Sequence, residues 1–334
     1  MKHVLRSTLI AAAVLIGSVP VAAKDYVMMT ASTGGTFHPV GVAIATMSKV
    51  KLQPTEGFSL TAVNSAGSGA NLQAMASGNA DFSILQGLFG AYAAEGSGPF
   101  KEPLTNVRSI SMLWENVEHF LIAKKYVKSG TVTDIINAKG QAAGFGAKNS
   151  GTLGSNTELL TKLGLDLEKD FTLVYAGYGP TADALANGQI AVAGIPSGPP
   201  AGAVTKLLAT NGNDVSLLSV TDDELKKMDG GRELWTRYVI PAGTYPGQDK
   251  DYQTIAQPNI LAVNASVSED HVYKLTKALY ENLAFLNAIH PATKDMALEK
   301  AIKGLPMPLH PGALRYFREQ GVNVPDRLIA KADK

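Results

Sequence analysis

The sequence contains no cysteine. This excludes disulfides, thiolate catalysis and cysteine-based metal sites, so the packed core alone must hold the fold. Charged residues are scarce at 18%, whereas apolar residues make up 45%. That balance excludes a long polar tail and is typical of a globular protein. Beyond residue 23, no apolar run is long enough to cross a bilayer.

Motifs for catalysis and nucleotide binding are also missing. The chain has no G-x-S-x-G nucleophile elbow and no P-loop. Gly144-Phe145-Gly146 is followed by Asn149 where a dinucleotide fingerprint requires glycine. The six histidines are scattered, and none pairs at the spacing of metal ligands. We therefore expect no cofactor, no metal and no catalytic residues.

The first 23 residues have the pattern of a secretory signal peptide. Lys2 and Arg6 precede the short apolar run Leu9–Gly17, and small residues end at Ala23. The run is shorter than a membrane-spanning helix, which argues against an anchor. Cleavage leaves 28 basic and 29 acidic residues. Such a nearly neutral chain has no electrostatic footprint for nucleic acid or anionic lipid, so we predict a soluble periplasmic protein.

Strand-like and helix-like segments alternate along the remaining chain, which predicts an α/β fold. A long helix capped by Ser268 is expected near the C-terminus, with an apolar stripe from Val272 to Leu286. The other expected strands are 26–31, 58–64, 80–85, 142–147, 172–176 and 189–195, and the other expected helices are 39–49, 70–77, 152–163 and 181–186.

Two loops rich in Gly, Ser and Thr, residues 32–36 and 148–152, each follow a strand and precede a helix. A helix N-terminus offers unpaired N–H groups and about half a positive charge, so such a loop binds an anion without a formal cation. The alternative is that each loop is an ordinary helix cap. Two such loops at matching places in the two half-chains favour an anion held in a cleft between two lobes.

Five short segments occur in a fixed order over nearly the whole mature chain. They are Thr33-Gly-Gly-Thr-Phe-His-Pro-Val-Gly41, Gly67-Ser-Gly-Ala-Asn-Leu72, Ala76-Ser-Gly-Asn-Ala-Asp81 through Gln86, Asn149-Ser-Gly-Thr152 and Leu305-Pro-Met-Pro-Leu-His-Pro-Gly-Ala-Leu-Arg-Tyr316. Each segment alone is weak, but their order and spacing are specific, and together they resemble the TAXI family, the solute receptors of one class of TRAP transporter.

This resemblance implies a type II periplasmic-binding-protein fold, with a ligand cleft between lobe I (24–117 and 262–334) and lobe II (118–261). It implies capture of a small organic acid or amino acid, such as glutamate, glutamine or 2-oxoglutarate, and delivery to a sodium-driven TRAP-type membrane permease. The contacts that it implies are Ser32, Gly35, Thr36, Phe37, Ser68, Asn71 and Gln86 in lobe I, and Asn149, Ser150, Gly151, Thr152 and Gly198 in lobe II.

Two departures from the family pattern, His38 and Lys148, lie beside the expected pocket. Lys148 is the only formal cation in the expected contact loops, so we predict that it meets a second carboxylate and that the ligand is a dicarboxylate. A solvated loop lysine is the alternative. Two other roles stay open: a periplasmic sensor that docks on a membrane receptor, and a hydrolase that uses Ser68 or Ser150, which would need a nearby base.

Overall fold

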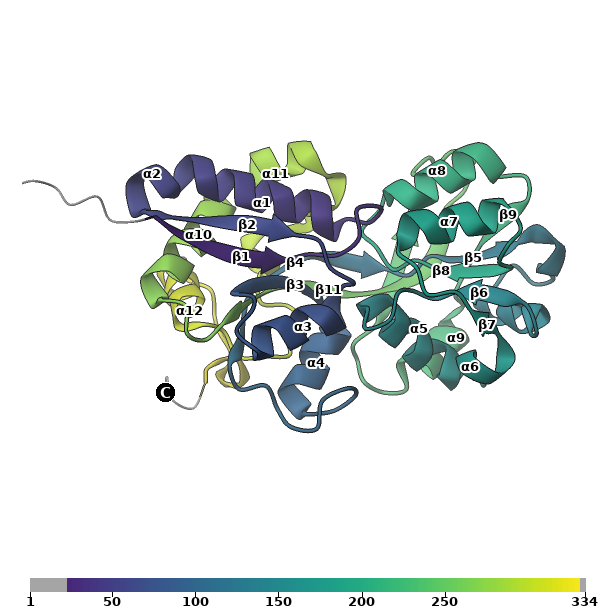
Figure 1. Cartoon of the computed structure of the whole chain (residues 1–334), viewed down its shortest axis with the longest axis horizontal. Coiled ribbons are helices and arrows are strands. Elements are labelled where there is room, and N and C mark those ends of the chain that lie inside the picture. Colours follow the sequence, from purple (N-terminus) through teal and green to yellow (C-terminus); the bar gives the residue numbers. More distant parts are fainter. Residues whose placement is uncertain (1–22, 331–334) are drawn as a thin grey trace, which may run out of the picture.

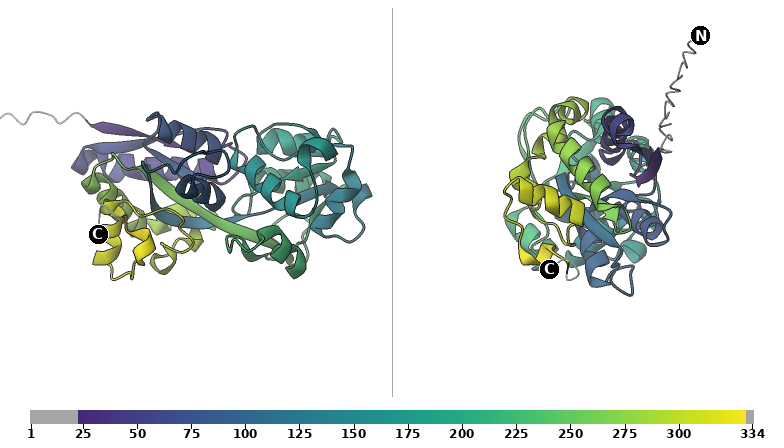
Figure 2. Two further views of the ribbon diagram at one scale, coloured as in Figure 1. Left: turned by 90° about the horizontal axis from the view of Figure 1, so that it is seen from below. Right: turned by 90° about the vertical axis from the view of Figure 1, so that its left-hand side faces the viewer.

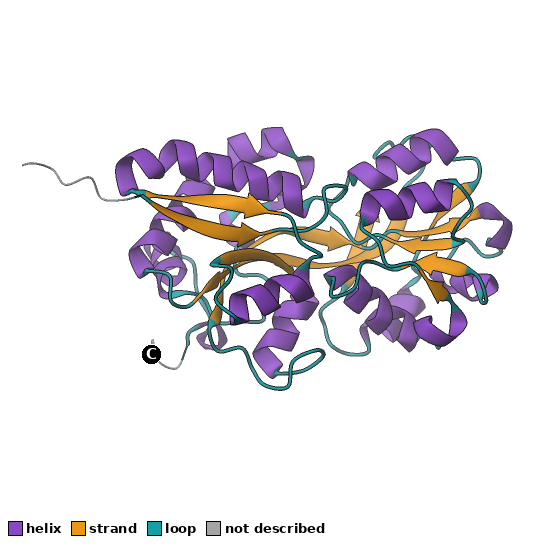
Figure 3. Ribbon diagram, viewed as in Figure 1, coloured by secondary structure: helices purple, strands orange, loops and turns teal. Residues whose placement is uncertain are grey.

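The computed structural model describes residues 23–330, so the predicted signal peptide lies almost entirely outside the described residues. Two α/β lobes lie side by side along the long axis of the molecule (Figure 1). Each lobe has a central sheet with helices on both faces (Figure 3). This two-lobed α/β arrangement agrees with the fold that the family resemblance implies.

A six-stranded sheet of order β10-β11-β3-β1-β2, with β4 also paired to β11, is centred in the first lobe. Its edge strand β10 pairs with the Tyr252–Ala256 part of β11 and packs against the core of the second lobe. Strands β1, β2 and β3 are parallel, whereas β11 runs antiparallel to β3, β4 and β10. The strands are β1 (Lys24–Met29), β2 (Phe58–Val63), β3 (Phe82–Gln86), β4 (Val107–Val117), β10 (Thr236–Ile240) and β11 (Tyr252–Asn264).

The second lobe contains a five-stranded sheet of order β7-β6-β8-β5-β9. Its parallel part has the predicted strands, although each is shorter than predicted, since only two or three residues of each strand are paired in the sheet. The strands are β5 (Phe120–Ala123), β6 (Ala142–Gly144), β7 (Thr172–Leu173), β8 (Val192–Gly194) and β9 (Val215–Leu218).

Four helices begin just beyond the strand ends that face the other lobe. They are α1 (Phe37–Lys51), α3 (Ser68–Ala76), α5 (Gly151–Lys162) and α7 (Tyr178–Ala186). Each matches a predicted helix and starts one to three residues earlier. The remaining α-helices are α2 (Gln53–Glu56), α4 (Gly87–Glu95), α6 (Leu167–Asp170), α8 (Gly202–Asn211), α9 (Asp222–Asp229), α10 (Glu269–Glu281), α11 (Leu283–Ile289) and α12 (Pro311–Glu319).

The prediction of a single long helix after Ser268 is wrong, because the structure has two helices there, α10 and α11. Ser268 caps α10 as predicted, accepting a hydrogen bond from the His271 backbone N–H at 3.3 Å. The helix then ends at Asn282, whose backbone leaves the helical region (φ −122°, ψ 27°) and whose side chain donates to the Ala278 carbonyl at 2.8 Å. This local side-chain bond competes with helix continuation, and α11 starts separately.

The chain passes between the lobes through long strands. The predicted crossing at 117/118 falls in the short link between β4 and β5. The predicted point at which the chain returns to lobe I, between residues 261 and 262, falls inside β11. This strand already pairs with β3 of lobe I from Asn259 onward. Figure 2 shows β11 as one long strand that runs from one lobe into the other. The connection is therefore made by strands and has no loose linker.

Candidate functional site

A cavity of about 160 Å³ lies between the lobes and is lined by residues of both. Its lining residues come from the loops that follow β1, β2, β6, β7 and β8, together with the last residue of β3. They are Ala31, Ser32, Gly35, Thr36, Phe37, Ser65, Ala66, Gly67, Ser68, Gln86, Ala147, Ser150, Gly151, Thr152, Ala176, Gly177, Tyr178, Pro196 and Ser197.

The N-terminal ends of four helices, α1, α3, α5 and α7, meet at this cavity. The first N–H groups of a helix lack partners inside the helix, and the end carries about half a positive charge. Only α5 has a side-chain cap, in which Ser150 Oγ accepts from the Leu153 N–H at 3.0 Å. The N-cap residues of α1, α3 and α7 make no such bond. The cavity is therefore suited to a negatively charged group.

The lining contains no Asp, Glu, Lys, Arg or His. Its one titratable side chain is Tyr178, and burial raises the pKa of this phenol, which keeps it neutral. The Tyr178 hydroxyl lies 2.8 Å from Thr152 Oγ1 and donates to the Pro196 carbonyl at 2.5 Å. A fixed, neutral hydroxyl thus forms part of the wall.

Direct contacts join the lobes around the cavity. Thr36 Oγ1 donates to the Gly198 carbonyl at 2.7 Å and lies 3.0 Å from Ser197 Oγ. On another side of the cleft, the Asn149 carbonyl accepts from the Ala70 N–H at 2.9 Å. These bonds link loops that are far apart in sequence, so they describe a closed arrangement of the lobes.

Nine of the thirteen predicted contact residues line the cavity. They are Ser32, Gly35, Thr36, Phe37, Ser68, Gln86, Ser150, Gly151 and Thr152. Both loops singled out in the sequence therefore reach one cavity from opposite lobes. That they contact a ligand there stays a prediction.

Two predicted contacts in the second loop lie outside the lining. Lys148 extends its ammonium over the ring of Tyr175, 4.9 Å from the ring centroid. Asn149 has a left-handed backbone (φ 60°) and lines a separate groove beside α4 and α5. The backbone changes direction at Asn149. Lys148 therefore points away from the cavity, whereas the residues from Ser150 to Thr152 line it.

The other two predicted contacts outside the lining support its walls. Asn71 is fully buried and its side-chain amide donates to the Thr30 and Ile84 carbonyls at 2.8 and 2.9 Å. Gly198 offers its carbonyl to Thr36, and a side chain there would meet the Trp114 indole at 2.6 Å. Asn71 Oδ1 also accepts from Ser65 Oγ at 2.6 Å, so each of the two residues holds a residue of the lining, Ser65 or Thr36.

Sequence reasoning missed Tyr178 and Ser197. Tyr178 begins α7, and a side chain on Gly35 of the opposite lobe would meet its ring at 2.7 Å. Ser197 Oγ accepts from the Thr36 N–H at 3.2 Å. A usable signal existed for Tyr178, because Gly177-Tyr178-Gly179-Pro180 is a third glycine-bearing loop between a strand and a helix.

Two titratable residues are buried where the chain crosses between the lobes. Burial raises the pKa of Glu118 to about 8. The polar side chains of Trp235, Gln257 and Ser155 lower the pKa by less than burial raises it. Neither of its carboxyl oxygens has a partner within hydrogen-bond geometry among residues 23–330. Burial lowers the pKa of the adjacent His119 to about 4. Both are therefore mainly neutral at pH 7.

Among residues 23–330, no His, Asp, Glu or Lys side chain is hydrogen-bonded to either serine of the hydrolase alternative. Ser68 Oγ accepts from the Gln86 N–H at 3.0 Å, and Ser150 Oγ caps α5. No histidine lines the cavity. Within the described part of the chain, no three residues of the His, Asp and Glu types gather as a metal site.

Charged side chains gather at the rim of the cleft, between α4 of the first lobe and α5 of the second. The Tyr92 hydroxyl donates to Glu158 Oε2 at 3.2 Å, and Arg232 Nε lies 3.2 Å from Glu158 Oε1. Arg232 also lies 3.9 Å from Glu95 and 5.6 Å from the Tyr92 ring centroid. Burial and the nearby Glu158 raise the pKa of Tyr92 to about 12.

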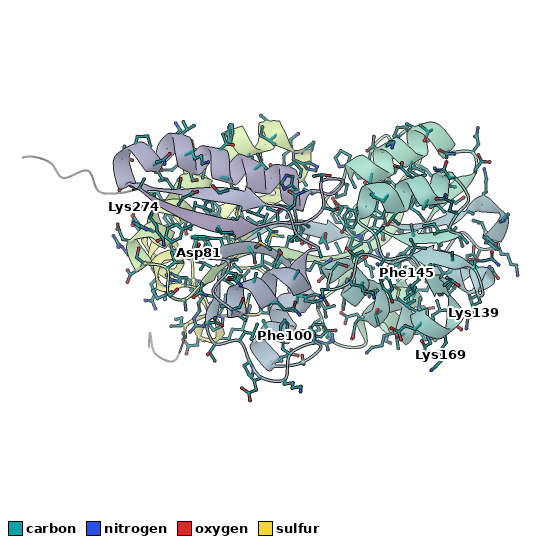
Figure 4. The ribbon with its side chains drawn as sticks, in the orientation of Figure 1. Asp81, Phe100, Lys139, Phe145, Lys169 and Lys274 are labelled. Atoms are coloured by element: carbon teal, nitrogen blue, oxygen red, sulfur yellow. The ribbon has the colours of Figure 1, made fainter. Side chains whose placement is uncertain are left out.

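Other ion pairs lie far from the cleft. Lys139 and Lys169, which pair with Asp170 and Asp166, lie at the outer edge of the second lobe, and Lys274 lies at the outer end of the first (Figure 4). Among residues 23–330, no helix combines the length and apolarity needed to traverse a bilayer.

Comparison with known proteins gives a family match and several structural neighbours. The model of the NMT1-like family matches residues 28–321. The binding-protein component of an ABC phosphonate transporter from Pseudomonas aeruginosa superposes with a TM-score of 0.53 and 14% identity, over 80% of this chain and 78% of that one. MatC from Rhodopseudomonas palustris with bound malate gives a TM-score of 0.53 and 17% identity, over 91% and 97%. The periplasmic binding protein BugD gives 0.52 and 18%, over 90% and 94%.

Proposed function

The chain belongs to the NMT1-like family, and from this premise we propose that it is an extracytoplasmic solute-binding protein. Its two lobes close on a small organic anion in the cavity between them and deliver it to a membrane permease. It performs no catalysis and needs no cofactor. The predicted signal peptide supports a periplasmic location.

The observation that carries this proposal is the neutral cavity to which both lobes contribute helix N-termini. An anion held there meets N–H groups from α1 and α3 on one side and from α5 and α7 on the other. Because both lobes contribute, the ligand binds the closed arrangement better than an open one. Binding thus shifts the population toward closure, which presents a new combined surface to a partner.

The class of permease is a finer part of the proposal. The resemblance to TAXI receptors supports a TRAP-type permease, whereas the phosphonate-binding neighbour comes from an ABC transporter. We propose the TRAP-type partner. A receptor that signals through a membrane sensor is the alternative, and co-purification of the chain with a co-expressed permease would distinguish transport from sensing.

The ligand in this proposal is a small organic acid. Glutamate and 2-oxoglutarate are supported by the family resemblance, and malate by the MatC neighbour. A thermal-shift panel of organic acids, amino acids and phosphonates tests the proposal. A ligand at 100 times its Kd stabilises the folded protein by about 2.7 kcal/mol, which gives a clear rise in Tm. If no compound of the panel raises the Tm, the assignment fails.

A further inference from the structure

We propose that His119 and Tyr245 form a buried clasp that fixes the loop 195–201 of the second lobe, and that this clasp stabilises the closed arrangement of the two lobes. Neither residue lines the cavity, so both act as positioning residues. The inference rests on the proposed function in one respect only, namely that the lobes open and close.

The loop 195–201, which follows β8, makes direct contact with the first lobe. Ser197 and Gly198 of this loop meet Thr36 through the hydrogen bonds described above. The backbone at Gly198 also lies against the first lobe, because a side chain there would meet the Trp114 indole at 2.6 Å. The loop is therefore a latch between the lobes, and its position decides whether these contacts can form.

The hydrogen bonds of His119 have only one possible direction. The ring is fully buried and neutral. Its Nδ1 lies 3.0 Å from the Ile195 carbonyl, which can only accept, so Nδ1 carries the proton. Nε2 must then accept from the Tyr245 hydroxyl at 2.7 Å. The Tyr245 oxygen in turn accepts from the Ala201 N–H at 3.0 Å.

This chain of bonds holds the latch at both ends, because Ile195 and Ala201 are its first and last residues. Between them, Ser197 is paired with Val117 at the crossing between the lobes, through N–H to carbonyl bonds of 2.9 and 3.2 Å. The same crossing carries His119. A loop that is already held loses little conformational freedom when the lobes close, so the clasp lowers the entropic cost of closure.

Tyr245 is itself fixed, which it must be in order to position the latch. Its side chain is buried. Its N–H donates to Gln248 Oε1 at 3.2 Å, and the Gln248 amide donates to the Ile240 and Pro241 carbonyls at 3.0 Å each. The hydroxyl that joins His119 to the latch therefore has a fixed position.

Tyr245→Phe removes this hydroxyl and keeps the ring. The chain has no cysteine, so spin labels at Thr46→Cys on α1 and Ala209→Cys on α8, two exposed positions on different lobes, report the separation of the lobes (Figure 1). Double electron–electron resonance gives the ratio of closed to open molecules, with and without excess 2-oxoglutarate. We expect this ratio to fall by about fivefold in Tyr245→Phe, because two buried groups lose their partner.

The matched control is Tyr238→Phe, which removes a hydroxyl from β10 outside this chain of bonds. It should leave the ratio unchanged, and thermal unfolding of each variant checks that the fold is intact. Equal ratios in the native chain and in Tyr245→Phe would overturn the inference. A native chain without a closed component under either condition would also overturn it.

A double-mutant cycle separates the clasp from a general loss of stability. Thr36→Val removes the hydroxyl that meets the latch, so Tyr245→Phe should lower the ratio less in that background than in the native chain. Equal effects in both backgrounds would contradict the inference. From the other end of the clasp, His119→Gln keeps one donor and one acceptor and should close more than His119→Leu. The reverse order would also contradict it.

The two proposals fail separately. If Tyr245→Phe lowers the ratio without acid, but no acid of the thermal-shift panel raises the Tm, the clasp stands and the proposed function fails. If an acid raises the Tm and closes the native chain, but Tyr245→Phe closes to the same extent, the proposed function stands and the clasp fails.

Discussion

The inner wall and the outer rim of the cleft join the same two lobes by different physical means. The wall is neutral and uses helix N-termini and hydroxyl groups such as those of Thr36 and Tyr178. The rim uses an ion-pair cluster of Glu95, Glu158 and Arg232 beside Tyr92. The wall is shielded from solvent, so small changes of charge or volume there are costly. At the half-exposed rim, water and salt screen each charge.

The largest expected effect is on the pH dependence of stability. It comes from Glu118, which is buried where the chain crosses between the lobes. Because its folded pKa of about 8 lies above the ordinary value of 4.5, the protonated carboxyl stabilises the fold fully below pH 4.5. That contribution is lost as the pH rises through 8. We expect the free energy of unfolding to fall between pH 5 and pH 9 by on the order of a few kcal/mol more in the native chain than in Glu118→Gln.

Denaturant titrations across this pH range measure the difference. Glu168→Gln, which alters an exposed glutamate of α6, is the matched control and should keep the native pH dependence. Parallel pH profiles for the native chain and Glu118→Gln would show that Glu118 does not titrate in this window.

An added methyl group in the wall should weaken ligand binding strongly. In Gly151→Ala the new Cβ of the second lobe would collide with Gln86 Oε1 and lie 2.7 Å from Ser68 Oγ of the first. We expect a loss of about 1–3 kcal/mol in binding, because overpacking opposes closure. Gly179→Ala is the control, since a Cβ there meets nothing within 4 Å. Calorimetry on both variants is the measurement, and equal affinities would refute the closed geometry.

Loss of one hydroxyl between the lobes should have a smaller effect. Thr36→Val keeps the shape but removes the bonds to Gly198 and Ser197. We expect binding to weaken by about 0.5–1.5 kcal/mol, the range for a neutral hydrogen bond. Thr36→Ser retains the hydroxyl and should bind as the native chain does. If Thr36→Ser and Thr36→Val lose affinity equally, the hydroxyl is not the relevant group.

At the rim, Glu158→Gln should change ligand affinity by only about 0.2–1 kcal/mol, because its ion pair with Arg232 is partly exposed. The effect should shrink when the salt concentration rises from 50 to 500 mM. Titrations of the variant and of Glu168→Gln at both salt concentrations provide the test. An effect that is large or independent of salt would mean that the rim is as buried as the wall.

Lys148→Met should have the smallest effect, within about 0.5 kcal/mol, because the ammonium lies over Tyr175 and not in the lining. Affinities for 2-oxoglutarate and for its terminal mono-amide should change equally. A selective loss for 2-oxoglutarate in calorimetry would instead restore the direct contact predicted from the sequence.

The sequence by itself determined the α/β class and the two glycine-rich loops, and its resemblance to TAXI receptors implied nine of the residues that line the cavity. The class and the loops are local features: strand periodicity, N-terminal caps such as Ser268, and glycines at strand–helix turns are encoded within a few residues of one another. The same local rules failed at Asn282, where a short side-chain bond ends a helix whose apolar stripe continues.

Only the tertiary structure decided which side chains share the cavity. Tyr178 enters the wall because closure places it against Gly35, and Ser197 because it meets Thr36 across more than 160 residues of chain. Lys148 leaves the wall because the chain turns at Asn149. Such positions depend on contacts between distant segments, and no periodicity or spacing records them. The neutrality of the wall is likewise a property of the assembled lobes, since it depends on where every charged residue lies once they have closed.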